Sequence, residues 1–541
     1  GRGGHREAFA ALCKAEGVRG VVAEMARTRQ EADSQASGCA FLGGFACDSA
    51  ANRSVIGEAE GGIAAIVAAM RHHEDSAKVQ AAACWALGHV AAHDTTNRNL
   101  VCEAGGLEVV ITAMHRHQED RVLQTNGCWA LVGVAAHNAA FRQRFVEDQG
   151  IAAVVSAMKH HKNEGYVQEF GCRMLGHVAV DSAANRSRIA KDGGIGAVLG
   201  AMRAHEDDIK VQEYGCWALG SFADDDSNRT IIAENGGIKA VVLAMRAHKE
   251  RSKLQAYGCR TLGYVATDST ANRTRIGEDA EGGIPAVVGA MLAHSKKSYV
   301  QAYGCFALLK LAADHAINRI RIGEEGGIGA VVSAMLTHAD ESKVQENGCR
   351  MLGNTAANNA NNRHRIGEEG GVGAVLAAMV NHRDRIKVQE NGCRMLGHVA
   401  VDNPAIRLRI VEEGGISIVV SAMTHYGEKS NVAWCGCRMF VHLAVGNAHV
   451  LTRVAEEGAT EAILRAMRRY RTLPRVQLKA LEAVASLAVE SRKLSVGIIV
   501  RQLIKHEAVE AIRAAIMSHP TDAGIQERGQ RALAAVEACL G

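Results

Sequence analysis

The sequence repeats itself at a nearly constant interval. The eleven residues KVQENGCRMLG occur at Lys343–Gly353 and recur unchanged at Lys387–Gly397. Looser copies run along most of the chain, at intervals of 43 to 46 residues. Their shared cysteine marks each copy and falls at Cys39, Cys84, Cys128, Cys172, Cys216, Cys259, Cys305, Cys349, Cys393 and Cys437. A period this steady predicts a tandem array in which each repeat packs against its neighbours.

Each period predicts three helices. Asn185–Ala190 predicts a short first helix, and the two glycines that follow it break that helix. Apolar residues at helical spacing predict a second helix over Ile195–Met202. After a polar loop, a third helix is expected over Val211–Phe222, with Cys216 among its buried positions. Helices this short cannot each bury a face alone, so neighbouring repeats must stack.

Composition fits an all-helical chain and narrows the class of partner. The chain has 4 prolines and 57 glycines, which favours helices joined by glycine corners. Net charge is +4, from 62 basic and 58 acidic residues. This balance gives no general attraction to nucleic acid or to an anionic membrane, and no apolar run is long enough to span a bilayer.

The fifteen cysteines are expected to be reduced. Ten of them recur once per repeat inside an apolar helix, where cysteine behaves as a small buried hydrophobic residue. None has the spacing of a redox or zinc motif. Free thiols are typical of the cytoplasm, or of the nucleus, and we expect that location. The chain begins at Gly1 without a methionine, so we expect it to be a segment of a longer protein.

The repeat resembles the armadillo repeat. Trp217-Ala218-Leu219-Gly220-Ser221 is similar to that family's W-A-L-x-N motif, and the pattern A-M-x-x-H followed by V-Q-x-x-G-C is most similar to the armadillo region of the leucine-rich-repeat kinases and related protist arrays. The resemblance implies an all-α, armadillo-type α-solenoid, a right-handed superhelix of about twelve three-helix repeats. We expect one array over 1–541, with degenerate repeats at 1–45 and 458–541 around regular repeats at 46–457.

The resemblance also implies a binding surface. In armadillo proteins, the residues one and five positions after the marker cysteine line a concave groove, where tryptophans form a shelf and asparagines grip the backbone of an extended ligand. Here Trp85, Trp129 and Trp217 match the shelf, and only Asn354 matches the amide, which departs from the pattern of nuclear import adaptors. The expected partner-binding residues are Trp85, His89, Trp129, Arg173, His177, Trp217, Ser221, Arg260, Tyr264, Phe306, Lys310, Arg350, Asn354, Arg394, His398, Arg438 and His442.

A structural role is the alternative for the charged members of this row. Glutamates lie four residues before three of its arginines, in the order that stabilises a helix. These pairs are Glu169–Arg173, Glu346–Arg350 and Glu390–Arg394.

Three further recurring residues are interpreted as structural. A histidine such as His117 follows each second helix and is expected to bond that helix's free carbonyls, since equivalent residues about 10 Å apart cannot share one zinc ion. An Asn-Arg pair such as Asn97-Arg98 opens the first helix, with Asn as N-cap and Arg pairing with acids such as Glu325, Glu369 and Glu413. A glycine before the marker cysteine suggests that a neighbouring helix passes too close for a side chain.

No catalytic, cofactor or metal motif is present, since the acidic residues repeat with the period whereas a catalytic set is unique. The first hypothesis is a non-enzymatic scaffold that binds an extended protein segment, basic or apolar at one end and acidic at the other. The second is a docking or regulatory region of a larger enzyme such as a kinase. A nucleic-acid-binding repeat protein is the third. No membrane insertion and no cofactor are expected, and the oligomeric state stays open.

Overall fold

The computed structural model describes residues 2–58, 61–135, 139–180, 182–278 and 282–540. These residues form 35 α-helices and no strand, which confirms the all-α prediction. The first helix, α1 (Arg2–Arg27), is kinked at Gly17, whose φ is 69°. No helix in the described part of the chain is long and apolar enough to cross a membrane.

After α1, the helices alternate in three kinds with the period of the sequence. The third helices, which carry the marker cysteines or their equivalents, are α2 (Ala32–Asp48), α5 (Ala77–Ala91), α8 (Arg121–Ala135), α11 (Gly165–Ala179), α14 (Ile209–Phe222), α17 (Ser252–Ala266), α20 (Ser298–Ala312), α23 (Ser342–Ala356), α26 (Ile386–Val399), α29 (Ser430–Leu443), α32 (Pro474–Lys493) and α35 (Ala523–Leu540).

The first helices are the shortest. They are α3 (Ala50–Glu58), α6 (Thr95–Glu103), α9 (Ala139–Glu147), α12 (Ala183–Lys191), α15 (Asp226–Glu234), α18 (Thr270–Gly277), α21 (Ala316–Glu324), α24 (Ala360–Glu368), α27 (Pro404–Glu412), α30 (Ala448–Glu456) and α33 (Gly497–Lys505).

The second helices follow the glycine corners. They are α4 (Gly62–His72), α7 (Gly106–Arg116), α10 (Gly150–His160), α13 (Gly194–Ala204), α16 (Gly237–Ala247), α19 (Gly283–Ala293), α22 (Gly327–Thr337), α25 (Gly371–Asn381), α28 (Gly415–His425), α31 (Ala459–Arg469) and α34 (Ala508–Ser518).

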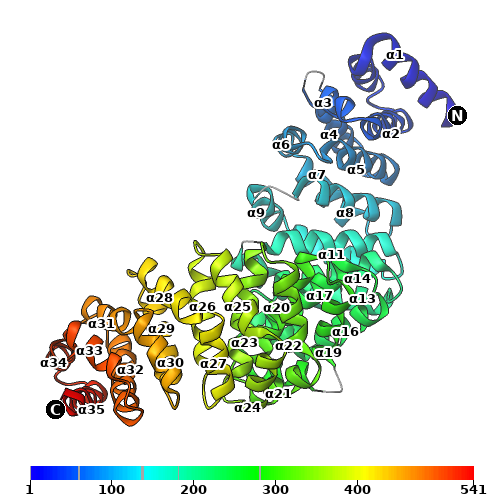
Figure 1. The fold of residues 1–541 in the computed structure, drawn as a ribbon. Helices are drawn as coiled ribbons and strands as arrows, with labels where there is room; N and C mark the ends of the chain where they lie inside the picture. Colours follow the sequence, from blue (N-terminus) through cyan, green and yellow to red (C-terminus); the bar gives the residue numbers. More distant parts are fainter. Residues whose placement is uncertain (1, 59–60, 136–138, 181, 279–281, 541) are drawn as a thin grey trace. The chain divides into compact units, whose positions relative to one another are not determined.

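The chain divides into two compact units, Gly1–Val265 and Ala266–Gly541, here called unit 1 and unit 2. Within unit 1, the third helices α2, α5, α8, α11 and α14 contact one another in sequence order, and the second helices α4, α7, α10, α13 and α16 form a parallel row (Figure 1). Unit 2 repeats this arrangement, with α20, α23, α26, α29, α32 and α35 in the row of third helices. Each unit is therefore a stack of repeats.

The glycine corner sets the angle between the first and second helices. The first glycine adopts a left-handed conformation, with φ of 83° at Gly193, which glycine adopts without steric cost. A Cβ on the second, Gly194, would lie 2.6 Å from Cγ2 of Ile189 on the preceding helix. At this corner the first glycine supplies the predicted left-handed conformation, and the second leaves room for Ile189.

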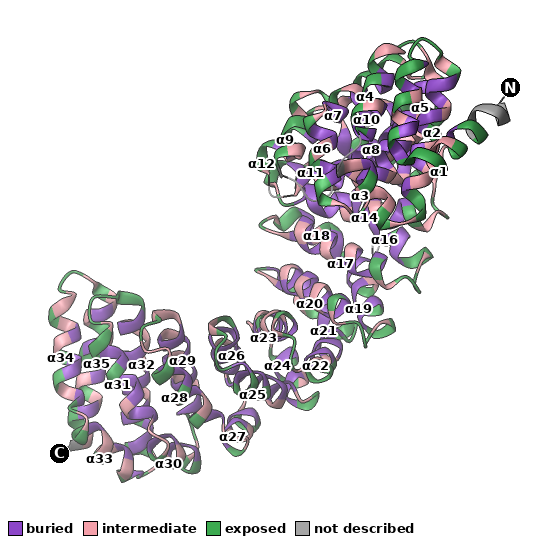
Figure 2. Cartoon of the chain, turned by 90° about the horizontal axis from the view of Figure 1, so that it is seen from above, coloured by how far each residue is buried: buried purple, intermediate pink, exposed green. Residues whose placement is uncertain are grey.

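The core is aliphatic and lies between the rows of helices. The positions predicted as core in the third helix α14 and the second helix α13 are 2% exposed or less, among them Val198, Met202, Val211 and Leu219. Figure 2 shows these buried stretches on the sides of the helices that face one another. The marker cysteines belong to this core, and burial raises the pKa of Cys128 to about 12. They are inert as nucleophiles, because the thiolate is the reactive form.

The glycine before nine of the ten marker cysteines makes room for a methionine, and Ala83 precedes the tenth, Cys84. A Cβ on Gly348 would lie 2.6 Å from Sδ of Met335, which comes from the second helix of the same repeat. Gly127 meets Met114 in the same way. The predicted close approach is confirmed, and the group that approaches is a side chain.

The asparagine of the Asn-Arg pair is not the N-cap, and the prediction was wrong. Asp94 caps α6, and its carboxylate accepts from the backbone N–H of Asn97 at 2.9 Å. The Asn97 side chain instead donates to the carbonyls of Val90 and of Arg53 in the preceding repeat, at 3.0 and 2.7 Å. Asparagine therefore joins two repeats through its amide.

The arginine of the pair also bonds carbonyls, and the predicted pairing with acids is confirmed in part. Arg186 pairs with Asp224 at 3.5 Å and Arg319 with Asp314 at 4.0 Å, but the predicted acids at the next corner are not the partners. Arg98 donates from Nε to the carbonyls of Ala91 and of Gly133 in the next repeat, at 3.1 and 3.0 Å. The acid Glu413 pairs with Arg409 of its own helix at 2.5 Å. The physical reason is position, because Arg98 points to the open end of a helix, where free carbonyls lie.

The recurring histidine bonds the preceding repeat rather than its own helix. Nε2 of His117 lies 2.7 Å from the carbonyl oxygen of Glu74, in the loop one repeat earlier. The carbonyls at the end of α7 are bonded by Gln124, whose amide donates to Met114 and His117 at 2.8 and 2.9 Å. The prediction for histidine was therefore wrong in its partner, and the glutamine of the V-Q pattern has the predicted capping role.

Candidate partner-binding surface

The predicted site residues lie on one side of the third helices, here called the third-helix face. It consists of the positions one and five after the marker cysteine, with the neighbouring positions two, three and six before it. Most of the predicted side chains there are half-buried, whereas Arg350 is exposed and Ser221 is buried. Half-buried side chains retain surface for a ligand while their packing holds them in place. The third-helix face is thus distinct from the core.

In the first part of unit 1, this face is aromatic. The ring of His89 lies 4.8 Å from that of Trp85 on the same helix and 5.7 Å from that of Trp129 on the next. Trp129 in turn lies 5.2 Å from Phe170, measured between ring centroids. Such separations are typical of favourable aromatic pairs. The rings of α5, α8 and α11 form one connected group.

The later repeats of unit 1 combine rings with cations. The ring of Trp217 lies 4.8 Å from that of His177 and 6.5 Å from that of Tyr257. The guanidinium of Arg173 lies 5.4 Å from the centroid of Tyr214. Arg260 lies over Tyr264 at 5.2 Å. These cation–π contacts hold the arginines on the same face.

Each tryptophan shelf is positioned by a glycine in the preceding repeat. A Cβ on Gly88 would lie 2.4 Å from the ring of Trp129, and one on Gly176 would lie 2.3 Å from the ring of Trp217. Each of these glycines follows a leucine in a third helix. Because the glycine has no side chain, the indole of the next repeat lies against the backbone of that helix. The tryptophans contribute to repeat stacking as well as to the surface.

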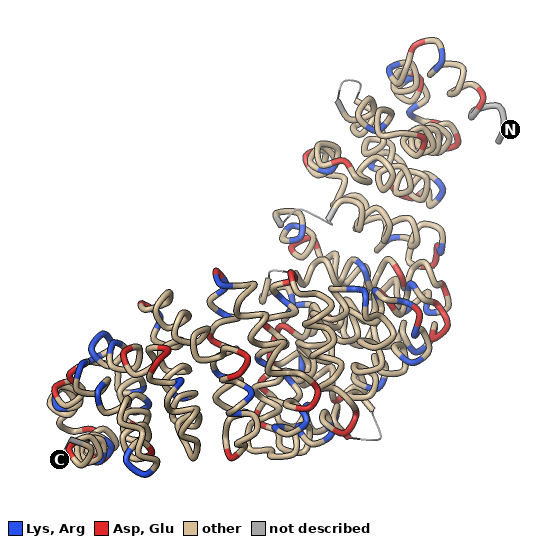
Figure 3. The backbone as a smooth tube through the Cα atoms, in the orientation of Figure 1, with Lys and Arg blue, Asp and Glu red and all other residues tan. Residues whose placement is uncertain are grey.

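In unit 2 the face carries cations. Arg394 bonds Glu390 at 3.2 Å, which confirms one of the three predicted pairs. Nη1 of Arg438 lies 3.1 Å from Nε2 of His398, and its guanidinium lies 5.8 Å from the centroid of Trp434. Both signs of charge are interspersed along each unit, as Figure 3 shows. The positive character is therefore local to this row.

The other two predicted pairs are replaced by different contacts. Glu346 pairs with Lys343 at 3.6 Å, rather than with Arg350. Burial raises the pKa of Glu169, while Arg173 extends over Tyr214. Helical spacing permits either the predicted ion pair or the observed contact, and the side chains of the neighbouring repeat determine which of them forms.

Two predicted site residues use their polar groups within the protein. The amide of Asn354 donates to the carbonyl of Leu309, one repeat earlier, at 3.4 Å. Ser221 is 3% exposed and donates to the carbonyl of Trp217 at 3.0 Å. The first contact joins two repeats, and the second joins successive turns of α14. Neither residue therefore presents its polar group as freely as the family pattern implies.

The histidines of the face differ in how they respond to pH. Burial, together with the positive charge of Arg438, lowers the pKa of His398 to about 3. Burial also lowers the pKa of His89 and of His442. His398 is therefore neutral at physiological pH.

The sequence analysis missed part of this face. Aromatic residues also occupy the position two before the marker cysteine, as at Phe170, Tyr214 and Tyr257, and Trp434 lies three before it. These positions precede the predicted row by three or four residues and share its side of the helix. The recurrence of rings at a fixed distance from the cysteine is the signal that identifies them.

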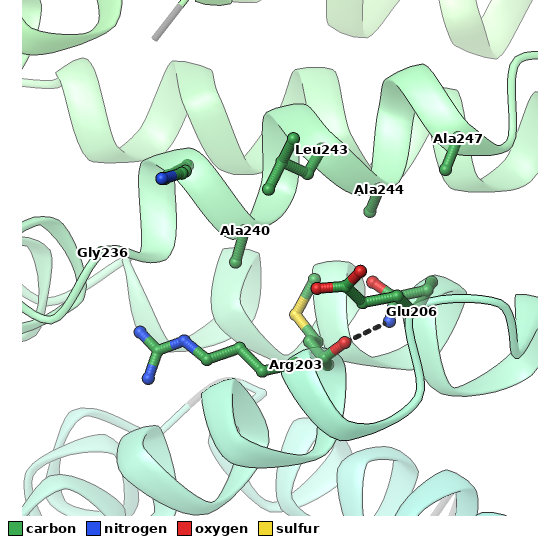
Figure 4. Close-up of a pocket in the computed structure, with 10 residues that line it drawn as sticks. Arg203, Glu206, Gly236, Ala240, Leu243, Ala244 and Ala247 are labelled. Atoms are coloured by element: carbon green, nitrogen blue, oxygen red, sulfur yellow. Dashed lines mark hydrogen bonds between the residues drawn. The ribbon is translucent and has the colours of Figure 1, made fainter.

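Three grooves lie elsewhere, between successive second helices. One of about 540 Å³ lies between α13 and α16, where Ala240 and Ala244 face Arg203 and Glu206 (Figure 4). Similar grooves of about 280 and 520 Å³ lie between α4 and α7 and between α25 and α28. Because they recur with the repeat and involve no predicted site residue, they follow from small residues on packed helices.

Comparisons with known proteins agree with this architecture. An engineered protein solved by the Northeast Structural Genomics Consortium matches with a TM-score of 0.68 and 22% identity, over 80% of this chain and 98% of that chain. A chain from a structure titled as a conserved phosphorylation switch controlling the interaction between cadherin and beta-catenin matches with a TM-score of 0.71 and 14% identity, over 98% of this chain and 99% of that chain. At these identities, the matches show the fold alone.

The family is shown by the sequence itself. No curated protein is significantly similar to the chain. A family model described as LRRK2 ARM repeat matches residues 58–235 and 324–536, which is more than half of the chain. The chain therefore belongs to the armadillo-repeat family described as LRRK2 ARM repeat.

Proposed function

We propose that the protein is a non-enzymatic scaffold that binds an extended segment of a partner protein along the third-helix face. One observation carries the proposal. The core of each repeat is aliphatic, whereas the half-buried row on the third helices is rich in tryptophan and arginine, such as Trp85, Trp217, Arg394 and Arg438. Tryptophan, tyrosine and arginine are the residues enriched at the energetic centres of protein interfaces.

The residues of the third-helix face predict a partner segment with two chemically different parts. Tryptophans at the predicted shelf positions lie in unit 1, which also has Arg173 and Arg260 at this register. Unit 2 has no tryptophan there and has Arg350, Arg394 and Arg438. An apolar or basic part of a ligand fits the first, and an acidic part fits the second. An extended chain advances about 3.3 Å per residue and a repeat about 10 Å, so each repeat contacts about three ligand residues.

A paired charge reversal tests this function. Peptides of fifteen residues are selected from a random display library against the intact chain, and their affinities are measured by calorimetry. Arg394→Glu combined with Arg438→Glu should weaken binding at least tenfold, because both guanidinium groups lie on the face. The variant should fold, since Glu482 occupies the same register one repeat later.

The matched control places the same charge change off the face. Arg383→Glu with Arg465→Glu alters two exposed arginines outside the third helices and should leave the affinity unchanged. If the Arg394 and Arg438 variant bound the selected peptides as tightly as the parent, the proposed surface would be wrong.

A second candidate function is that of a docking or regulatory region within a larger multidomain enzyme such as a kinase. The match to the family model described as LRRK2 ARM repeat favours this candidate, because that description names the repeat region of a larger protein. The full coding sequence tests it. A catalytic domain in the same reading frame would support this candidate, and a reading frame that encodes repeats alone would contradict it.

A further inference from the structure

Unit 1 uses its aromatic residues selectively. The whole chain has 4 tryptophans and 8 tyrosines. All those within Gly1–Val265 lie in third helices, whereas the buried aromatic residues of the unit's mainly aliphatic core are phenylalanines such as Phe145 and Phe222. With Phe170, they form what we call the aromatic strip: Trp85, Trp129, Tyr166, Phe170, Tyr214, Trp217, Tyr257 and Tyr264.

The strip is continuous from one repeat to the next. Each of the successive helices α5, α8, α11, α14 and α17 contributes at least one ring. Ring centroids on neighbouring helices lie 5.2 Å apart for Trp129 and Phe170, and 6.5 Å apart for Trp217 and Tyr257. Tyr166 extends the group outward, since it lies 6.1 Å from Phe170 and is 69% exposed. A ligand on this strip meets ring faces at every repeat.

The strip already carries its own cations, which argues for an uncharged ligand. The guanidinium of Arg173 and the ammonium of Lys210 lie 5.4 and 5.9 Å from the centroid of Tyr214. Arg260 lies 5.2 Å from that of Tyr264. A lysine-rich segment would be repelled by these charges, whereas an uncharged segment would not. Apolar contacts with the rings remain the main source of affinity.

The spacing of the repeats matches one backbone conformation. Packed helices advance by about 10 Å per repeat. A polyproline II helix has three residues per turn with a rise of about 3.1 Å each, so every third residue returns to the same side after about 9 Å. A proline-rich segment in this conformation therefore presents one pyrrolidine ring to each repeat. Its conformation exists before binding, so little entropy is lost.

We propose that the aromatic strip of unit 1 binds a proline-rich, uncharged segment of the partner in the polyproline II conformation. Prolines at every third residue stack on the aromatic rings of successive third helices, and the rings of one third helix are here called a rung. This inference rests on the proposed scaffold function and specifies the chemistry of its ligand. Five rungs and three residues per rung give a segment of about fifteen residues.

Synthetic peptides of fifteen residues test the ligand class. The probes are an all-proline peptide, a glycine-serine peptide and a (Lys-Ser-Gly)5 peptide, each labelled with fluorescein and titrated with the intact chain by fluorescence polarisation. The proline peptide should bind at least tenfold more tightly than the glycine-serine peptide. Equal affinities, or tighter binding of the lysine peptide, would overturn the proposal.

A second pair of probes tests the register. The peptide (Pro-Gly-Ser)5 places a proline on each rung, whereas a peptide of the same composition with its five prolines together reaches about two rungs. The in-register peptide should bind more tightly. If the clustered peptide bound as well, the match between ligand and repeat spacing would be wrong.

Charge substitutions locate the site without removing the fold. Trp85→Arg with Trp217→Arg places at those positions the residue that unit 1 itself has at Arg173 and Arg260. The double variant should lose at least tenfold in affinity for the all-proline peptide. Leu292→Arg with Leu336→Arg, at two exposed positions on second helices of unit 2, is the matched control and should bind as the parent does. Unchanged binding by the double variant, with helix content retained by circular dichroism, would refute the site.

The outcomes separate this inference from the scaffold function. Peptides selected from the random library that bind the parent and fail to bind the Trp85 and Trp217 variant would support the scaffold, even where the all-proline probe failed. In that case the proline-rich ligand would be excluded and the surface retained.

Discussion

At the scale of the residue, buried glutamine amides join the second and third helices of a repeat, and half-buried imidazoles join each repeat to the preceding one. Gln345 is 1% exposed and bonds the carbonyls of Met335 and His338, while His338 reaches the carbonyl of Ser295 one repeat earlier. Buried carbonyls without partners are costly, so each of these side chains stabilises a corner that would otherwise expose the backbone to water.

Loss of the glutamine amide should therefore destabilise unit 2. Gln345→Ala removes two hydrogen bonds at 2.8 and 2.9 Å and leaves both carbonyls buried. We expect a decrease of about 1–3 kcal/mol in the free energy of unfolding, measured by chemical denaturation. Gln143→Ala, at an exposed position, is the control and should change it by less than about 0.5 kcal/mol. Equal effects of the two substitutions would show that the capping contact contributes nothing.

The glycine beside the marker cysteine gives a second test. Gly348→Leu, like Gly392→Leu, forces a side chain against a methionine, and we expect a cost of about 1–3 kcal/mol or more. Gly289→Leu is the matched control, because a Cβ there meets no atom within 4 Å. In an array the damage is local, so hydrogen exchange should rise in the repeats around Gly348. A uniform rise over all repeats would contradict this expectation.

His398 predicts how stability depends on pH. Its pKa is about 3 in the folded protein and about 6.5 in the unfolded chain, so the unfolded chain binds a proton first as the pH falls. The titration of His398 therefore leaves the free energy of unfolding unchanged above pH 6.5 and lowers it progressively as the pH falls from 6.5 to about 3. His398→Gln should become more stable relative to the parent by roughly 1 kcal/mol for each pH unit in this range.

The control for this titration is His449→Gln, an exposed histidine of the same unit. Its unfolding free energy should follow that of the parent between pH 7 and pH 5. If the His398 variant followed the parent as well, the low pKa of His398 would be refuted.

At the scale of the element, much of the fold could be predicted from spacing within one repeat. Apolar residues at helical intervals identified the three helices of 185–222, and the double glycine identified the corner, because both signals are local in sequence. The partners of Asn97, Arg98 and His117 could not be predicted, since they lie about 35 to 45 residues away in neighbouring repeats. The N-cap was misassigned because Asp94 and Asn97 both suit a helix start.

The candidate surface likewise has residues that could be predicted from their spacing and contacts that could not. The tryptophans and arginines were found because they recur at a fixed distance from the cysteine. The rings of Phe170 and Tyr257 were missed because aromatic residues occupy their position in only four consecutive repeats, while small and polar residues occupy it in the others. Ser221 and Asn354 were placed on the correct side of the helix, but their hydrogen bonds depend on how closely neighbouring repeats approach.

The second helices predict tolerance at one position. Leu336 is 60% exposed on α22, and the same register holds Arg203, Arg246 and Arg468 in other repeats. Leu336→Arg should therefore change the free energy of unfolding by less than about 0.5 kcal/mol. Val331→Arg, which buries a charge on the same helix, should unfold the surrounding repeats. Equal loss of stability in the two variants would contradict this assignment of faces.

At the scale of the whole molecule, the third-helix face changes its chemistry along the chain while the core keeps its composition. Tryptophan shelves occur in unit 1, together with Arg173 and Arg260, and arginines predominate in unit 2, over a buried layer of valine, leucine, methionine and cysteine in both. Packing determines the core in every repeat, and it leaves the face free to differ. We infer that this variation along the face determines which partner the protein binds.

Oxidative footprinting of the protein with a peptide selected from the display library tests this account most directly. Hydroxyl radicals modify exposed tryptophan, methionine and leucine side chains, and mass spectrometry measures the extent at each residue. Bound peptide should protect tryptophans of the third-helix face, such as Trp85 and Trp217, and leave Leu292 and Leu336 of the second helices and Met517 of α34 as reactive as in the free protein. Protection of Leu292, Leu336 or Met517, with the tryptophans unchanged, would contradict it.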